Sequence, residues 1–168
     1  YTHNDKLTLI TGWVLGWDTG FNQLNKGNAG LNGFTYKFSD DTALTYTFML
    51  GNLGARNAPG SDNLSYNHSI VLTHNITDKL SYVFNSDLVA TDGFTSGIPG
   101  GTSGVGIAND QYSIVNYLFY KVSDCVGFGG RAEWYKTDGV SINDVTFGMN
   151  YRPHANFVLR PEIRYEWS

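Results

Sequence analysis

Residues 157–167 read FVLRPEIRYEW, and apolar and polar side chains alternate through almost the whole stretch. Successive side chains of a β-strand point to opposite faces, so residues i and i+2 share a face. One predicted face carries the apolar residues Phe157, Leu159, Pro161, Ile163, Tyr165 and Trp167. The other carries Val158, Arg160, Glu162, Arg164 and Glu166. The stretch therefore predicts a strand with one oily face and one charged face.

The same alternation recurs upstream. In residues 125–135, Phe128 and Trp134 fall on one predicted side and Arg131 and Glu133 on the other. The run at 111–122 is apolar on both sides and assigns no face. The pattern predicts nine strands, at 6–16, 31–38, 42–51, 66–76, 80–90, 111–122, 125–135, 144–152 and 157–167.

Connections of two lengths separate these strands. Short polar turns are predicted at 4–6, 39–41, 77–79, 123–125 and 154–156, and longer loops rich in Gly, Asn, Ser and Thr at 18–30, 52–65 and 91–110. Short turns at one end and long loops at the other are typical of an outer-membrane barrel, whose strands of ~9–11 residues cross the bilayer at a tilt. The predicted fold class is all-β, a single domain over 1–168 forming an antiparallel up-and-down meander: a transmembrane β-barrel or part of one.

Composition agrees with this fold class. The 168 residues are 41% hydrophobic, 15% aromatic and only 15% charged, and no run approaches the ~18 apolar residues of a transmembrane helix. The net charge of -4 gives no argument for nucleic acid. The single cysteine, Cys125, excludes an internal disulfide framework. We expect no cofactor and no metal.

Alternation alone does not say which face points inward. A soluble or surface-exposed barrel that binds a ligand in an apolar cavity remains the alternative, and its distinguishing sign is burial of Phe34, Phe128, Phe147 and Ile163. The alternating loop lengths favour the membrane. So do aromatic residues predicted near strand ends on the oily side, where a membrane-interface girdle lies: Trp13, Trp17, Trp134, Tyr135, Tyr165 and Trp167.

An up-and-down ring closes with antiparallel pairing only when its strand number is even. Nine predicted strands therefore indicate part of a longer barrel, with strands missing at one or both ends, or one miscounted strand.

The charged face predicts a water-filled lumen. The candidate pore-lining residues are Lys37, Asp87, Arg131, Glu133, Arg152, Arg160, Glu162, Arg164 and Glu166. Charges there set a transverse field that selects among small hydrophilic solutes or ions. Four arginines on three successive strands, 131, 152, 160 and 164, predict a basic ladder paired with glutamates 133, 162 and 166; the alternative role is cross-strand pairing that holds register.

Catalytic chemistry is not expected. His68 and Ser69 are adjacent, so on a strand they point to opposite faces and His68 does not activate Ser69. The expected partners are outer-membrane lipid and the transported solutes. Nothing in the sequence identifies an oligomer interface, so a homo-oligomer remains open.

The C-terminal half also carries a family resemblance. Residues 129–139 (GGRAEWYKTDG), 146–156 (TFGMNYRPHAN) and 159–165 (LRPEIRY), with 16–22 (GWDTGFN) earlier, resemble the β-barrel porin family of OmpL-like outer-membrane proteins. In that family the pattern continues through another loop to a final strand with a terminal aromatic residue. The resemblance implies a porin-like protein of a Gram-negative outer membrane and leaves the solute open.

Overall fold

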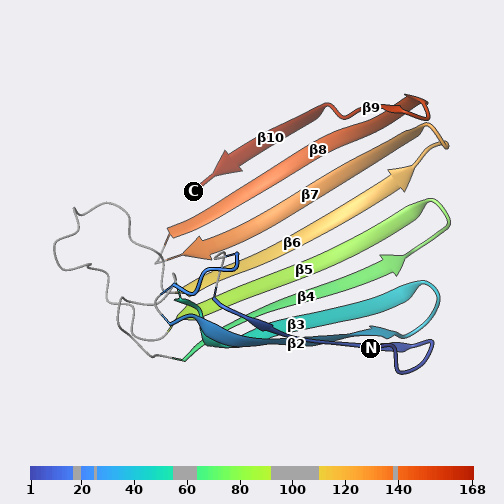
Figure 1. Ribbon diagram of the computed structural model, residues 1–168. Coiled ribbons are helices and arrows are strands. Elements are labelled where there is room, and N and C mark those ends of the chain that lie inside the picture. The colour runs from blue at the N-terminus through green and yellow to red at the C-terminus, as the bar shows by residue number, and fades with distance from the viewer. Residues whose placement is uncertain (17–19, 25, 55–63, 92–109, 138–139) are drawn as a thin grey trace.

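The strands form one antiparallel sheet (Figure 1). The computed structural model describes residues 1–16, 20–24, 26–54, 64–91, 110–137 and 140–168. The strands are β1 (Leu7–Val14), β2 (Asn28–Lys37), β3 (Thr42–Asn52), β4 (Ser65–Asn75), β5 (Leu80–Thr91), β6 (Asp110–Lys121), β7 (Val126–Thr137), β8 (Val140–His154), β9 (Phe157–Leu159) and β10 (Glu162–Trp167). Their spatial order is β1 to β8 in sequence and then β10, with β9 also paired to β8. The predicted all-β meander is confirmed, and the sheet is open, with β1 and β10 at its edges.

Four of the five predicted short turns are built alike. The backbone N–H of His3, Phe38, Ile76 and Val122 each donates to the carbonyl four residues later, at 2.8, 2.9, 2.9 and 3.0 Å. In the same turns an Asn, Ser or Thr oxygen accepts from the N–H two residues on, as Ser39 Oγ does from Asp41 at 3.2 Å. These local hydrogen bonds explain why the Asn/Ser/Thr-Asp sequences end one strand and begin the next.

The β7–β8 connection differs from the prediction. A loop was expected between 135 and 144, but the ladder continues until Thr137 pairs with Val140. Only residues 138 and 139 lie between these partners, and their sequence, Asp-Gly, is among the most favoured for a two-residue hairpin. The alternation of long and short connections therefore fails at this hairpin. The loops predicted at 52–65 and 91–110 lie largely outside the described residues.

The strand predicted at 157–167 is interrupted, which corrects the sequence-based expectation. Leu159 ends β9, Glu162 begins β10, and Pro161 between them has no N–H to donate to a ladder. The carbonyl of Pro161 still accepts from the N–H of Met149 at 3.1 Å. The pairs Tyr151–Leu159 and Gly148–Glu162 have the same offset, so the faces stay in phase across the break.

The register divides the sheet into two chemically different faces, because directly paired residues share a face. We call one the polar face, defined by the paired row Thr35, Thr45, Val71, Asn85, Val115, Glu133, Asp144 and Glu166 and by the residues in phase with it. We call the other the aromatic face, defined by the adjacent row Phe34, Tyr46, Ile70, Ser86, Ile114, Trp134, Asn143 and Trp167.

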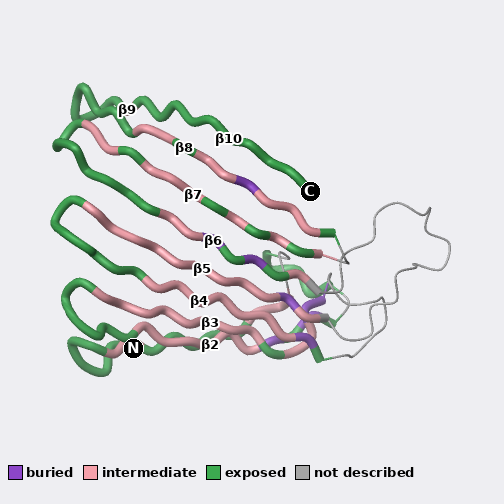
Figure 2. The backbone as a smooth tube through the Cα atoms, turned by 180° about the vertical axis from the view of Figure 1, so that it is seen from behind, coloured by how far each residue is buried: buried purple, intermediate pink, exposed green. Residues whose placement is uncertain are grey.

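The two faces differ in burial. The buried strand residues all lie on the polar face, toward the strand ends opposite the short turns (Figure 2): Ala29, Ser65, Val89, Ser113, Val115 and Asp144. On the aromatic face Phe128, Phe147 and Ile163 are 49%, 64% and 72% exposed, and Phe34 is half-buried. The burial expected of a soluble barrel with an apolar cavity is therefore not observed at these residues.

A small apolar core lies at the same end of the sheet. Leu53, which follows β3, is completely buried and packs with Ala29 and Val89, and Val14 and Met49 pack against this group. It lies on the polar face of β1 to β5, whereas the ion pairs of Arg131 and Arg164 lie on β7 to β10. Within the described ranges, no helix has the length and apolar character needed to span a membrane.

Candidate functional site

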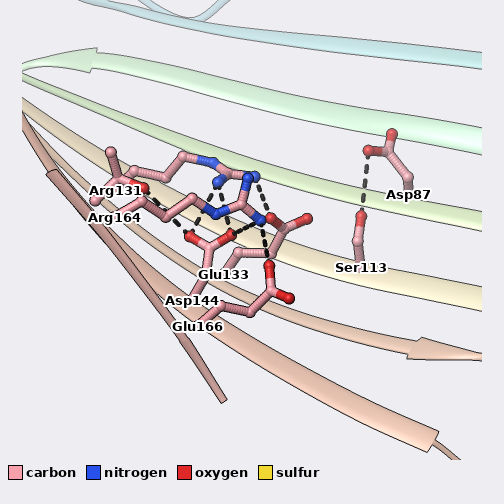
Figure 3. Close-up of polar contacts among 8 residues, drawn as sticks. Asp87, Ser113, Arg131, Glu133, Asp144, Arg164 and Glu166 are labelled. Atoms are coloured by element: carbon pink, nitrogen blue, oxygen red, sulfur yellow. Dashed lines mark hydrogen bonds and ion pairs between the residues drawn. The ribbon is translucent and has the colours of Figure 1, made fainter. Parts of the chain in front are cut away.

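Five charged side chains from three strands converge on the polar face (Figure 3). Glu133 of β7, Asp144 of β8 and Glu166 of β10 are direct register partners and place three carboxylates in one row. Arg131, Thr146 and Arg164 form the neighbouring row, so two guanidinium groups lie beside the carboxylates. The i, i+2 spacing within β7 and β10 is what puts an arginine next to a glutamate on one face.

Asp144 is the centre of this ion-pair network. Arg131 Nη1 donates to its two oxygens at 3.0 and 2.9 Å, and Arg164 Nη2 lies 2.7 Å from Oδ2. Arg131 also pairs with Glu133, and Arg164 donates to Glu166 at 2.8 Å. The Asp144 side chain is only 2% exposed, whereas that of Arg164 is 50% exposed. A buried carboxylate needs such charged donors because it has lost its hydration.

The network carries both signs of charge at close range. Three carboxylates in one cross-strand row repel one another, and the arginine row offsets this repulsion. Two positive and three negative groups leave one net negative charge when all are ionised. The polar face therefore carries a local electric field at this point.

The predicted basic ladder is only partly assembled. Arg131 and Arg164 come together over Asp144, but Arg152 and Arg160 lie toward the short-turn end and line a second pocket of about 360 Å³ with Lys121 and Asp124. Among the residues that the structure describes, Glu162 takes part in no ion pair. The four arginines therefore belong to two places on the polar face, because the break at Pro161 and the length of β8 separate them.

The two remaining predicted pore-lining residues lie on other strands of the same face. Lys37 ends β2 opposite Ala43, near the short turn. Asp87 of β5 accepts hydrogen bonds from Asn85 at 3.2 Å and from Ser113 of β6 at 3.3 Å. Figure 3 shows the Asp87–Ser113 pair beside the ion-pair network. The candidates within strands fall on one face, and the constant offset on both sides of Pro161 places Arg160 there too. Their lining of a pore stays a prediction.

The central residue, Asp144, is absent from the predicted set. It begins the strand predicted at 144–152, eight residues before the candidate Arg152. Because residues i and i+2 of a strand share a face, alternation back from Arg152 places Asp144 on the same face and is the signal that finds it.

The aromatic candidates gather near the long-loop ends of their strands. Trp13, Trp134, Tyr165 and Trp167 all lie on the aromatic face, with exposed fractions of 68%, 37%, 67% and 43%. The rings of Tyr165 and Trp167 stack at 5.5 Å. Trp17 lies outside the described residues. Tyr135 pairs with Ser113 on the polar face, so its assignment to the oily side was wrong, because neighbours in a strand alternate. A membrane-interface girdle stays a prediction.

His68 and Ser69 are held apart by the strand that carries them. His68 lies on the aromatic face, where its Nδ1 is 3.0 Å from the Tyr66 hydroxyl. Ser69 lies on the polar face and accepts from Asn85 Nδ2 at 3.4 Å. These two side chains therefore do not form a nucleophile–base pair.

Comparison with known proteins identifies the family of the chain. The family model described as "Putative beta-barrel porin-2, OmpL-like" matches residues 1–168. No curated protein and no solved structure matches this chain. An antiparallel meander with one charged and one aromatic face agrees with such a barrel wall. The chain belongs to the Putative beta-barrel porin-2, OmpL-like family.

Proposed function

We propose that this protein is a channel in the outer membrane of a Gram-negative bacterium, where small hydrophilic solutes or ions diffuse passively along the polar face. Family membership indicates a porin-type function rather than catalysis. In this proposal the aromatic face meets lipid and the polar face is the wall of a water-filled lumen. Closure between the edges β1 and β10, directly or through further strands, makes that wall continuous.

The observation that carries the proposal is the opposite chemistry of the two faces. The aromatic face exposes large side chains such as Phe147 and Ile163, while the polar face holds Asp144 and its arginines. Exposing apolar surface to water costs about 25 cal/mol per Å². Lipid removes this cost, and a lumen supplies water to the charged groups.

The charges of the polar face then determine which solutes pass most readily. The ion-pair network places opposite charges side by side on the wall, while Arg160 has no ion-pair partner among the described residues. Such groups attract counter-ions and orient dipolar solutes without a fixed binding step. Passage is driven only by the concentration gradient or the potential, so no cofactor enters the mechanism.

The test is single-channel recording of the full-length protein in a planar lipid bilayer. Arg160→Glu changes the charge of the polar face, and Lys136→Glu makes the same change on the exposed aromatic face of β7. We expect ohmic steps from the unmodified protein and a reversal potential that moves toward cation selectivity in Arg160→Glu only. Insertion without conductance, or equal shifts in both variants, contradicts an open lumen lined by the polar face.

A further inference from the structure

An aromatic pair lies on the polar face, where small and charged residues otherwise predominate. Tyr117 and Phe119 of β6 pair with Arg131 and Gly129, which fixes them on that face. Their rings stack at 5.8 Å with an interplanar angle of 12°. Phe119 is 40% exposed. A flat apolar surface is therefore presented to the side that the proposed function assigns to water.

Glycines leave an open space beside these rings. Phe119, Gly129, Gly148 and Glu162 are consecutive register partners on β6, β7, β8 and β10. A Cβ at Gly129 would lie 3.1 Å from the Phe119 ring, so the ring lies directly over this glycine. The two glycines form the floor of a pocket of about 340 Å³, with Phe119 on one side and Glu162 on the other. This volume is at the lower end of small-molecule sites.

Polar groups without partners surround the pocket. Asn150, Arg160 and Glu162 line it, and within the described part of the chain their side chains make no hydrogen bond or ion pair. Arg131 lies over the Tyr117 ring, 6.0 Å from its centroid, and is already paired with Asp144. The pocket thus offers an amide, a guanidinium and a carboxylate next to two ring faces.

We infer that this pocket binds one ring of a neutral cyclic saccharide during its passage, an inference that rests on the proposed function. The apolar C–H face of a sugar ring packs on Phe119 and Tyr117, while its hydroxyls exchange hydrogen bonds with Asn150, Arg160 and Glu162. A simple anion is opposed by the Glu162 carboxylate and a simple cation by Arg160. A hydroxyl-rich neutral solute suits both groups.

The first experiment compares glucose with sorbitol, its acyclic reduced form, as blockers of single-channel current through the full-length protein. Glucose is expected to produce concentration-dependent interruptions, and sorbitol is not. Phe119→Leu keeps an apolar side chain but removes the flat ring, so glucose affinity falls about tenfold. Phe147→Leu makes the same change on the aromatic face and leaves glucose binding unchanged.

The outcomes separate the inference from the proposed function. An open channel in which glucose and sorbitol act alike, or in which Phe119→Leu binds glucose normally, overturns the saccharide site and leaves the channel intact. Absence of conductance overturns the proposed function instead. In that case titration calorimetry of glucose into the detergent-solubilised protein decides: saturable binding that Phe119→Leu weakens supports the site, and its absence refutes it.

Discussion

Arg131 and Asp144 are joined diagonally across β7 and β8, with Nη1 of the arginine 3.0 and 2.9 Å from the two carboxylate oxygens. They are not register partners, since Arg131 pairs with Thr146 and Asp144 with Glu133. The carboxylate is buried, so its charge depends on Arg131 and on Arg164, 2.7 Å away, rather than on water. Removing this contact therefore changes both the stability of the sheet and the charge of its polar face.

Asp144→Asn is expected to lower the free energy of unfolding and to make the polar face less negative. Losing one partner of a buried pair costs about 3–5 kcal/mol, and the exposure of Arg164 reduces this to on the order of 2 kcal/mol here. The charge removed shifts ion selectivity toward anions. Urea titration of the protein folded in lipid vesicles measures the first effect, and the reversal potential in a planar bilayer measures the second.

Glu162→Gln is the matched control for stability. It also removes a carboxylate from the polar face. Among the described residues Glu162 has no ion-pair partner, so the substitution breaks no ion pair. The free energy of unfolding should then change by less than about 0.5 kcal/mol. Equal losses of unfolding free energy in Asp144→Asn and Glu162→Gln would show that the ion pairs of Asp144 do not stabilise the fold.

The orientation of the faces predicts opposite results for two neighbouring substitutions in β4. Ile70→Arg places a charge on the aromatic face and should cost about 2–4 kcal/mol if the residue lies near the bilayer midplane. Ser69→Arg places the same charge on the polar face directly opposite Asp87, whose carboxylate can form an ion pair with the new guanidinium group. The measurement is the folded fraction in lipid vesicles, read from heat-dependent migration in electrophoresis. Equal folded fractions in the two variants would contradict the assignment of these residues to an apolar face and a hydrated face.

The strands and turns were predictable because their signals are local. Apolar and polar residues alternate within each strand. The turns at Ser39 and Thr77 are stabilised by hydrogen bonds between residues two positions apart. The position of each charged residue on a face follows from the same alternation. The interruption at Pro161 was also visible in the sequence, as a residue that cannot donate to a ladder.

The ion-pair network was not predictable without the β7–β8 register. Pairing of Thr137 with Val140 places Glu133 opposite Asp144. With a loop expected between 135 and 144, the register of β7 against β8 is not determined, and the contact between Arg131 and Asp144 cannot be predicted. Reading Asp138-Gly139 as a hairpin signal supplies the missing constraint, so the error at this connection accounts for the missed pairing of Glu133 with Asp144.

Gly51, the single glycine of β3, is predicted to tolerate replacement poorly. Its φ is +145°, and a Cβ there would lie 2.4 Å from the carbonyl oxygen of Asn28. Gly51→Ala is expected to destabilise the protein by about 1–3 kcal/mol through backbone strain and this clash. Gly12→Ala in β1 is the control, because its nearest contact would be 4.0 Å away. Urea midpoints in lipid vesicles measure both; equal midpoints would contradict the strain.

An ion pair in the turn between β6 and β7 is expected to make the stability of the protein depend on pH. Lys121 Nζ lies 2.7 Å from Asp124 Oδ1, and its hydrogen bond and charge lower the pKa of that exposed carboxyl. A carboxyl whose pKa is lower in the folded state stabilises that state above its unfolded pKa, and the contribution is lost as the pH falls through the folded pKa. Lys121→Met should raise the pKa of Asp124, and Lys121→Arg should leave it low. Carboxyl carbon NMR of the protein in detergent micelles across the acidic range measures the titration, and equal midpoints in the two variants would show that the pair does not form in solution.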